Sequence, residues 1–483
     1  MTDNGFPMNR RRVLGGLAAG ALAGPLLACN AEAQAQQRTA VVIGAGIAGL
    51  SAAHDLTQAG FAVSIFEKWD FVGGRMRETW RGPLYGPTHA IGVFDANADM
   101  FALAEEVGIA EQMKGVGVSD AFRITNTAGT YDSGLRFNVD EVAAIPGLSS
   151  ETRRALPRLR GDLEEIAATV DPCMWTTGTA WDTESLADYY RRALGPQAGQ
   201  EIVDNWIDPV LLAFGMSAEE VSATTMLALF AQQGAEFRVP AGGIGILTST
   251  LGDMLDVQTR TTVRYITPPA PDGRRTIHYL NEEHERMSIT PDVVVLATEG
   301  KYVASLVQDL PAHEAAFFSD IKFTKAAGAT FVFKEGREPE TSDGGGYIPT
   351  FPDAIKRKVG AWSVSPGDPA ADVPATASIY LNRTDFNNWQ QSGQTQQDYC
   401  FDLLSHFYPA ARRDDIADQV VVGCDDLVNM PVGYLTQAAR ILDAQEAGRR
   451  SLYFAGEYLA GCHTGAACAS GRRAARTIVK HWI

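Results

Sequence analysis

The feature that most constrains this chain is a glycine-rich turn between a predicted strand and a predicted helix near its beginning. Residues 40–43 (A-V-V-I) are apolar and mostly β-branched, as expected of a buried parallel strand. The chain then reads G-A-G-I-A-G over 44–49, followed by a helical pattern over 50–59 and a second apolar strand over 61–66. Glu67 ends that strand, 23 positions after the first glycine. This order predicts a βαβ unit at the start of a doubly wound α/β sheet.

Each position of this turn has a physical role in binding a dinucleotide. Gly44 makes the tight turn, Gly46 lets the backbone approach a pyrophosphate, and Gly49 lets the helix pack closely on the strand. The N–H groups at the N-terminus of the helix face the phosphates. Glu67 accepts hydrogen bonds from the ribose hydroxyls of the adenosine. The pattern therefore predicts a bound dinucleotide.

A second glycine pair follows the acidic residue, where Gly73, Gly74 and Arg75 lie within V-G-G-R-M at 72–76. At this point the chain resembles the flavin-containing amine oxidase superfamily, which includes monoamine oxidases, protoporphyrinogen oxidases and the carotenoid and squalene-type desaturases. The motif of that superfamily is a strand, G-x-G-x-x-G, an acidic residue and then G-G-R. The resemblance implies that the dinucleotide is FAD rather than NAD and that these three residues help to bind it.

Later segments resemble the superfamily in the expected order. They are V-P-A-G-G-I-G at 239–245, V-R-Y-I at 263–266, D-V-V-V-L-A-T at 292–298, L-Y-F-A-G-E at 452–457, and G-A at 465–466 followed by S-G-R-R-A-A at 470–475. The resemblance implies that the backbone of Val263 touches the adenine, and that Gly456 and Glu457 contact the ribityl–phosphate region. A helix starting near Gly465 and Ala466 would aim its N-terminus at the N1/O2 edge of the flavin, where it stabilises the negative charge of the reduced ring.

The length of 483 residues and the positions of these motifs predict the domain organisation. The fold class is α/β, a Rossmann-type FAD-binding domain with an interleaved α+β substrate domain. The FAD-binding domain comprises 38–99, 236–304 and 426–483. The substrate domain comprises a largely helical part, 100–235, and a sheet-forming part, 305–425. Its expected elements are helices at 100–107, 150–168, 184–194 and 218–232, and strands at 329–333 and 377–381.

Residues 1–36 are predicted to be an export signal. Three arginines at 10–12 precede a mild Gly/Ala-rich apolar stretch over 13–28, which is too short for a membrane span. This pattern is typical of a twin-arginine signal, which suits a protein that folds around its cofactor before export. Processing stays open between a lipoprotein box, which would make Cys29 a lipid-anchored N-terminus, and an A-x-A cleavage site within 31–35. The mature protein is expected in the periplasm, either free or membrane-anchored.

Charge and cysteine content exclude several other classes. The net charge of −17 argues against a nucleic-acid partner, because phosphate binding needs a basic face. Six cysteines, one of them in the predicted signal, include no C-x-x-C pair, and eight histidines include no H-x-x-x-H pair. These counts argue against a disulfide framework and against a zinc site, so we expect no metal.

Positions that distinguish the subfamilies depart from the monoamine oxidase pattern. Monoamine oxidases flank the flavin with two aromatic residues, which the motif spacing places at Asp425 or Asp426 and at Cys462. Many amine-oxidising members also hold a water near flavin N5 with a lysine. Lys325 lies near that place, but counting along the strand gives Gly328, so Lys325 is predicted to be a surface or strand-start residue.

The mode of cofactor attachment and a second resemblance follow from two more positions. Cys424 stands one residue away from the position of covalent flavin attachment in monoamine oxidases, so we expect non-covalent FAD. G-P-T-H at 86–89, followed by Asn97, is similar to a G-x-H…N segment of the squalene and plant-type carotene desaturase branch. His89 is either a residue facing the flavin or a packed or surface histidine.

Three interpretations of the function follow. The first is an oxidoreductase that moves a hydride from a C–H of an amine or amino-acid-like substrate to flavin N5, with O₂ or an electron carrier as acceptor. The second is a desaturase, protoporphyrinogen oxidase-like enzyme or isomerase acting on a hydrophobic substrate. The third is a binding module with a flavoprotein fold and no turnover. We prefer the first, with the catalytic residues, the substrate, the acceptor and the oligomeric state left open.

Overall fold

The computed structural model describes residues 37–483 apart from 80–81, 88–89, 91, 119–121, 127, 134–136, 213–214, 232–235, 338–349, 353–360, 366–373, 382 and 408–409. The predicted export signal and His89 therefore lie outside the described residues.

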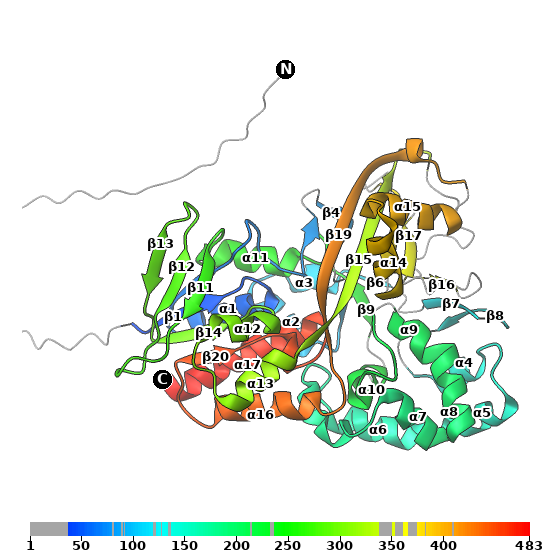
Figure 1. The fold of residues 1–483 in the computed structure, drawn as a ribbon, viewed down its shortest axis with the longest axis horizontal. Coiled ribbons are helices and arrows are strands. Elements are labelled where there is room, and N and C mark those ends of the chain that lie inside the picture. The colour runs from blue at the N-terminus through cyan, green and yellow to red at the C-terminus, as the bar shows by residue number, and fades with distance from the viewer. Residues whose placement is uncertain are drawn as a thin grey trace, which may run out of the picture. The chain divides into compact units, whose positions relative to one another are not determined.

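The first sheet is parallel and has five strands in the order β10-β2-β1-β14-β20 (Figure 1). The strands are β10 (Val257–Gln258), β2 (Ala62–Phe66), β1 (Thr39–Ile43), β14 (Val293–Leu296) and β20 (Leu452–Phe454). β14 is buried throughout and β1 after its first residue, which suits the middle of a parallel sheet with both faces covered. Three separate stretches of the chain build this sheet, and the predicted α/β fold class is confirmed.

The first and the last helix of the described chain pack against each other. They are α1 (Ile47–Gln58) and α17 (Thr464–Trp482), in blue and red in Figure 1. A Cβ added to Gly471 would lie 2.0 Å from the carbonyl oxygen of Ala48, so the two backbones approach closely. Beside this point the hydroxyl of Ser51 donates to the carbonyl of Cys468 at 3.2 Å. Small residues therefore place the C-terminal helix directly on the helix of the nucleotide-binding motif.

A second sheet has seven strands in the order β19-β15-β18-β17-β16-β7-β8. The strands are β19 (Ile416–Asn429), β15 (Lys322–Phe333), β18 (Thr376–Leu381), β17 (Ala361–Ser365), β16 (Thr350–Pro352), β7 (Phe122–Asn126) and β8 (Gly129–Ser133). Helices α14 (Arg383–Ser392) and α15 (Gln396–Phe407) cover one face (Figure 1). Ala329 and Phe331 pack toward these helices, so Thr330 between them lies on the other face. There its hydroxyl is hydrogen-bonded to that of Ser378 at 2.8 Å.

Three small sheets complete the strands. They are β11 (Thr262–Ile266), β12 (Ile277–Leu280) and β13 (Arg286–Ile289); β5 (Val93–Phe94), β9 (Phe237–Val239) and β6 (Val116–Val118); and β3 (Glu78–Thr79) with β4 (Gly82–Pro87). The other α-helices are α2 (Ala98–Glu106), α3 (Ala110–Lys114), α4 (Val139–Ala143), α5 (Ser150–Ala155), α6 (Leu159–Thr169), α7 (Leu186–Leu194), α8 (Pro196–Ile202), α9 (Asp208–Leu212), α10 (Ala223–Phe230), α11 (Ile246–Met254), α12 (Val303–Leu306), α13 (Ala312–Asp320) and α16 (Tyr434–Glu446).

Two of the predicted helices differ from the observed ones for identifiable reasons. The helix predicted over 150–168 is divided into α5 and α6 by a 3₁₀ turn at Leu156–Arg158, because Pro157 has no N–H to continue the α-helical hydrogen bonds. The helix predicted to begin at residue 218 begins at Ala223, because Ser222 adopts an extended backbone and donates its N–H to the carbonyl of Met430. The segment 100–235 also supplies β7 and β8 to the seven-stranded sheet, which was predicted from 305–425 alone.

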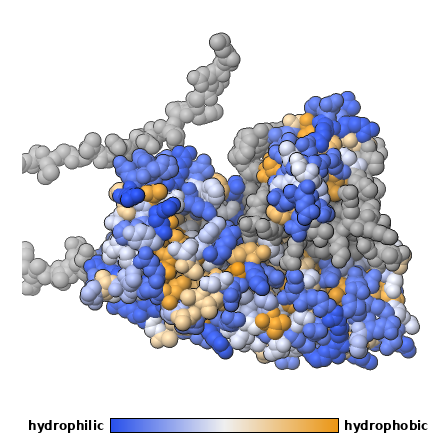
Figure 2. All heavy atoms as spheres, viewed as in Figure 1, coloured by the Kyte–Doolittle hydropathy of each residue, from blue (hydrophilic) through white to orange (hydrophobic). Residues whose placement is uncertain are grey.

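The surface is mainly polar on the face shown in Figure 2, where the described apolar residues form small patches between charged ones. Scattered apolar residues of this kind are normal on protein surfaces. Among the described residues, the helices lack the combination of length and hydrophobicity that crossing a bilayer requires.

Arg472 joins three helices through an ion-pair network. Its guanidinium lies 3.0 Å from Asp55 on α1 and 2.7 Å from Glu106 on α2, and it donates to the carbonyl of Asp99 at 3.1 Å. Arg472 and Asp55 are 11% and 14% exposed, so solvent screens this pair little, whereas it screens the pair with the 39% exposed Glu106 more strongly. The network therefore fixes α17 on both α1 and α2.

Replacing Arg472 with methionine should lower the free energy of unfolding by about 3 kcal/mol, because it leaves two carboxylates without their counter-charge. Arg473→Met is the matched control, since Arg473 lies on the same helix and, among the described residues, forms its only ion pair with Glu446, where both side chains are more exposed than Arg472 and Asp55. That variant should lose about 1 kcal/mol or less. Chemical denaturation of both variants measures the difference, and equal losses would contradict the network.

Candidate functional site

The glycine turn is built so tightly that side chains are excluded at its two ends. Gly44 has a φ of +108°, and a Cβ there would lie 2.6 Å from the carbonyl oxygen of Ala297. A Cβ on Gly49 would lie 1.9 Å from the carbonyl oxygen of Gly44. The turn is therefore fixed between β1, α1 and the end of β14, as the roles predicted for Gly44 and Gly49 require.

Gly46 differs from its neighbours because its backbone borders open space. Its φ of −75° and ψ of 174° are accessible to any residue, and a Cβ there meets no heavy atom within 4 Å. Gly73 forms a parallel bridge to Gly46 and donates its N–H to the carbonyl of Ala45 at 2.8 Å. A Cβ on Gly74 would lie 3.5 Å from the Cα of Gly46. The structure thus brings the two predicted glycine motifs together beside one open backbone segment.

Glu67 holds the turn in place. Its carboxylate accepts the N–H of Ala45 at 2.8 Å and that of Trp69 at 2.9 Å, and the residue is 8% exposed. Burial raises the pKa of the carboxyl group, and the two backbone N–H groups act in the opposite direction. Each oxygen retains lone-pair capacity for a ribose hydroxyl, which was its predicted role. The bracing of the turn by Glu67 was not predicted from the sequence.

An ion pair joins the N-terminal and C-terminal motifs. The guanidinium of Arg75 lies 2.6 Å from the carboxylate of Glu457, which is nearly buried. The preceding Gly456 donates its N–H to the hydroxyl of Ser470 at 3.0 Å, and a Cβ there would lie 2.3 Å from the ring of Tyr458. Residues predicted from opposite ends of the sequence to contact one cofactor therefore lie side by side.

The helix predicted near Gly465 and Ala466 is α17, and His463 caps it. The Nδ1 atom of His463 accepts the N–H of Ala466 at 3.3 Å, and its Nε2 atom lies 2.9 Å from the carbonyl oxygen of Pro172. Burial lowers the pKa of His463 to about 4, so the imidazole is neutral near pH 7. A Cβ on Gly465 would lie 2.3 Å from the side chain of Asn97, so a residue with a side chain does not fit at this position. Sequence reasoning missed His463, although a hydrogen-bonding residue directly before a predicted helix is a capping signal.

For three other predicted positions the structure shows local surroundings but does not test the predicted role. Val263 lies in β11, paired with Tyr279 outside the parallel sheet, so its contact with adenine stays a prediction. Cys462 is a half-buried residue, and burial of its thiol raises the pKa to about 12, which keeps it protonated. Gly328 is paired with Val422 on β19, and its carbonyl accepts from Gln396 at 2.8 Å.

The side chains of four predicted positions on β15 and β19 lie outside the described part of the structure. They are Lys325, Cys424, Asp425 and Asp426. The strand pairing shifts between Thr324, opposite Leu427, and Ala326, opposite Cys424. Lys325 therefore belongs to an irregular part of β15, whereas Gly328 belongs to the regular part. The assignment of Gly328 to the lysine position stays a prediction.

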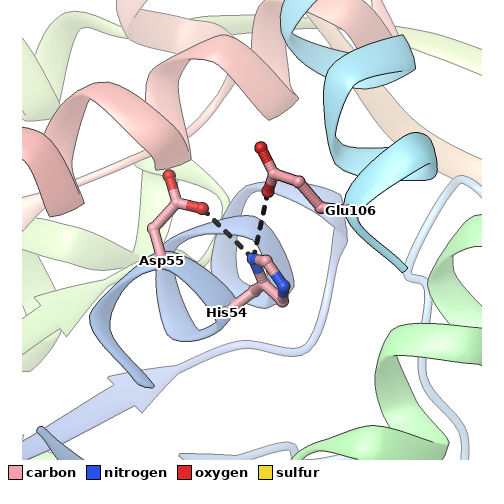
Figure 3. A group of neighbouring side chains, drawn as sticks. All are labelled: His54, Asp55 and Glu106. Atoms are coloured by element: carbon pink, nitrogen blue, oxygen red, sulfur yellow. Dashed lines mark hydrogen bonds and ion pairs between the residues drawn. The ribbon is translucent and has the colours of Figure 1, made fainter. Parts of the chain in front are cut away.

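One group of side chains has the composition of a metal site but not its electrostatics. His54, Asp55 and Glu106 converge in Figure 3, where Nδ1 of His54 lies 3.2 Å from Asp55 and 3.6 Å from Glu106. Both carboxylates already pair with Arg472. Because the guanidinium charge of Arg472 already neutralises both carboxylates through their other oxygens, we interpret this group as part of the helix network.

Known proteins resemble this chain in sequence and fold. A family model described as "Flavin containing amine oxidoreductase" matches residues 47–479. The chain is 26% identical over 294 residues to an L-amino-acid oxidase of Sistrurus catenatus edwardsii, covering 56% of this chain and 52% of that protein. It is 26% identical over 201 residues to protoporphyrinogen oxidase 2 of Arabidopsis thaliana, covering 40% of this chain and 35% of that protein. The chain thus matches about half or less of the length of these curated relatives.

Cyclohexylamine oxidase from Brevibacterium oxydans IH-35A has a similar fold, with a TM-score of 0.65 and 17% identity, over 92% of this chain and 99% of that one. The fold and the joined motifs define a dinucleotide-binding α/β protein. The chain belongs to the flavin containing amine oxidoreductase family, and the resemblance predicted from the motifs is confirmed. The open backbone beside Gly46 fits the pyrophosphate of the flavin dinucleotide that this family implies.

Substitution of Gly46 by alanine should weaken cofactor binding without weakening the fold. The new methyl group meets no protein atom but enters the space in which a pyrophosphate approaches the backbone. We expect normal unfolding of the cofactor-free protein and at least a tenfold loss in affinity for FAD. Gly448→Ala is the control, because a Cβ there also meets no atom within 4 Å. Fluorescence titration with FAD measures both, and equal affinities would contradict the assignment.

Proposed function

We propose that this protein is an FAD-dependent oxidoreductase that removes a hydride from a C–H of an amine or amino-acid-like substrate, with FAD held non-covalently. The observation that carries the proposal is the Arg75–Glu457 ion pair, which joins the G-G-R motif to the C-terminal Ala-Gly-Glu turn beside the open backbone at Gly46. Similarity to an L-amino-acid oxidase and the fold shared with cyclohexylamine oxidase support the substrate class.

Different segments of the chain would bind different parts of FAD. The backbone at Gly46 and the N-terminus of α1 would hold the pyrophosphate, and Glu67 would accept the ribose hydroxyls. Gly456 and Glu457 would hold the ribityl–phosphate region, and the N-terminus of α17 would lie at the N1/O2 edge. Bound FAD supplies the two-electron acceptor, and the protein orients the substrate C–H and excludes water. O₂ or an electron carrier would then take up the electrons.

A second candidate is an enzyme that acts on a hydrophobic substrate, such as a desaturase, a protoporphyrinogen oxidase-like enzyme or an isomerase. Gly328 favours it, because counting along the strand predicts this residue where many amine-oxidising members carry a lysine. The residue at the second aromatic position, Cys462, also favours it, as does similarity to protoporphyrinogen oxidase 2. A binding module without turnover is the third candidate, and flavin content separates it from both enzymes.

Anaerobic bleaching of the flavin tests the proposal directly. The purified protein should be yellow and should release FAD on denaturation. Without oxygen, the visible absorbance of its oxidised flavin should disappear when amines or amino acids are added. A parallel panel of lipophilic alkenes and porphyrinogens tests the second candidate. Bleaching by that panel alone would replace the first candidate with the second, and a colourless protein that takes up no FAD would overturn both.

We further propose that residues 1–36, outside the described structure, direct export by the twin-arginine route to the periplasm, with or without a lipid anchor on Cys29. Replacing Arg10 and Arg11 with lysine should retain the yellow protein in the cytoplasm. Fractionation of cells that express each form measures this. Unchanged export of the double variant would contradict the proposed route.

A further inference from the structure

The N-terminus of α17 presents backbone donors without acceptors. The N–H of Ala466 donates to the side chain of His463, and that of Ala467 donates to the carbonyl of His463 at 3.1 Å. For the N–H groups of Thr464 and Gly465, no acceptor exists among the described residues. The bond from Ala467 is the first regular hydrogen bond of the helix. Of the four N–H groups that precede it, that of His463 donates to the carbonyl of Gly461 and that of Ala466 to the imidazole, so those of Thr464 and Gly465 remain.

His463 also ties this helix end to a distant segment. A carbonyl oxygen only accepts hydrogen bonds, so the 2.9 Å contact with Pro172 places the proton on Nε2 of His463. The lone pair of Nδ1 is then free to accept the N–H of Ala466. The neutral imidazole thus bridges the backbone at the start of α17 and that of Pro172, which lies 291 residues before His463.

Trp175 supplies an independent observation at the same place. Its ring lies 5.3 Å from the ring of His463, and its backbone N–H donates to the carbonyl of Ala460 at 2.7 Å. A Cβ on Gly461 would lie 2.8 Å from the indole, so the ring packs directly on the backbone that leads into α17. The residue is 1% exposed, and its indole N–H has no hydrogen-bond partner among the described residues. A buried N–H without a partner is costly, so this donor is available to an acceptor that the described residues do not supply.

We propose that His463 and Trp175 prepare the N-terminus of α17 to bind a delocalised anion, His463 as a positioning residue and Trp175 as a third N–H donor. The inference rests on the proposed function, in which the anion is the N1/O2 edge of the reduced flavin. By holding Ala466 and Pro172 at once, His463 fixes the direction of the two remaining backbone donors. The helix dipole adds to the attraction for negative charge.

Sulfite binding to the FAD-loaded protein tests this proposal, because addition of sulfite to flavin N5 leaves negative charge at N1/O2. His463→Leu removes the cap and the bond to Pro172, and should raise the dissociation constant for sulfite roughly tenfold and make the reduction potential more negative. His463→Asn retains an acceptor for capping and should recover most of the affinity. Trp175→Phe keeps the ring packing, removes one N–H, and should raise the dissociation constant several-fold.

His481→Leu is the matched control. His481 lies at the other end of α17, where its Nε2 atom is 3.0 Å from the carbonyl oxygen of Glu446. This variant loses the same kind of imidazole–carbonyl contact and should bind sulfite like the wild type.

The outcomes separate this inference from the proposed function. Wild-type protein that binds no FAD overturns both. Wild-type protein that binds FAD, with unchanged sulfite affinity and potential in His463→Leu and Trp175→Phe, overturns the inference alone. If His463→Leu does not load FAD, Trp175→Phe decides, because unchanged sulfite affinity in that variant also overturns the inference.

Discussion

The structure depends on the close backbone packing of the first glycine turn. A Cβ at Gly49 would overlap the carbonyl oxygen of Gly44, and one at Gly44 would overlap that of Ala297. These contacts set the angle at which α1 leaves β1, and α17 in turn packs on α1 where Gly471 meets the carbonyl of Ala48. The direction of the C-terminal helix, and with it the position of His463, therefore follows from the space left by missing side chains.

Ion pairs connect the segments that this packing brings together. Arg75 and Glu457 belong to motifs 382 residues apart, by their numbers in the sequence, yet their charges are in direct contact. Arg472 on α17 likewise pairs with carboxylates of α1 and α2. Breaking either contact would leave a partly buried charge unpaired, which is costly in a low-dielectric environment. The two halves of the proposed FAD site are thus held by electrostatics as well as by helix packing.

The sequence predicted the elements that carry local motifs, and it could not predict contacts between distant segments. The strand, turn and helix around Gly44 form within about thirty residues, so periodicity and glycine spacing suffice to find them. In contrast, Asp182 accepts the backbone N–H groups of Gly433 and Thr436 at the start of α16, about 250 residues away. Such a cap depends on the completed fold and leaves no local pattern. The same holds for β7 and β8, which join the seven-stranded sheet through a parallel pairing of β7 with β16.

The face of the seven-stranded sheet that is free of α14 and α15 bears on the choice between polar and hydrophobic substrates. Thr330 and Ser378 on this face are hydrogen-bonded to each other, which uses one of their two hydroxyl protons and leaves the other as a donor. Gly328, on the same face two residues before Thr330, offers no side chain at all. None of these three residues carries a charge, so recognition of a cationic amine at this face would depend on other elements. The bleaching panel distinguishes such recognition from the binding of a hydrophobic molecule.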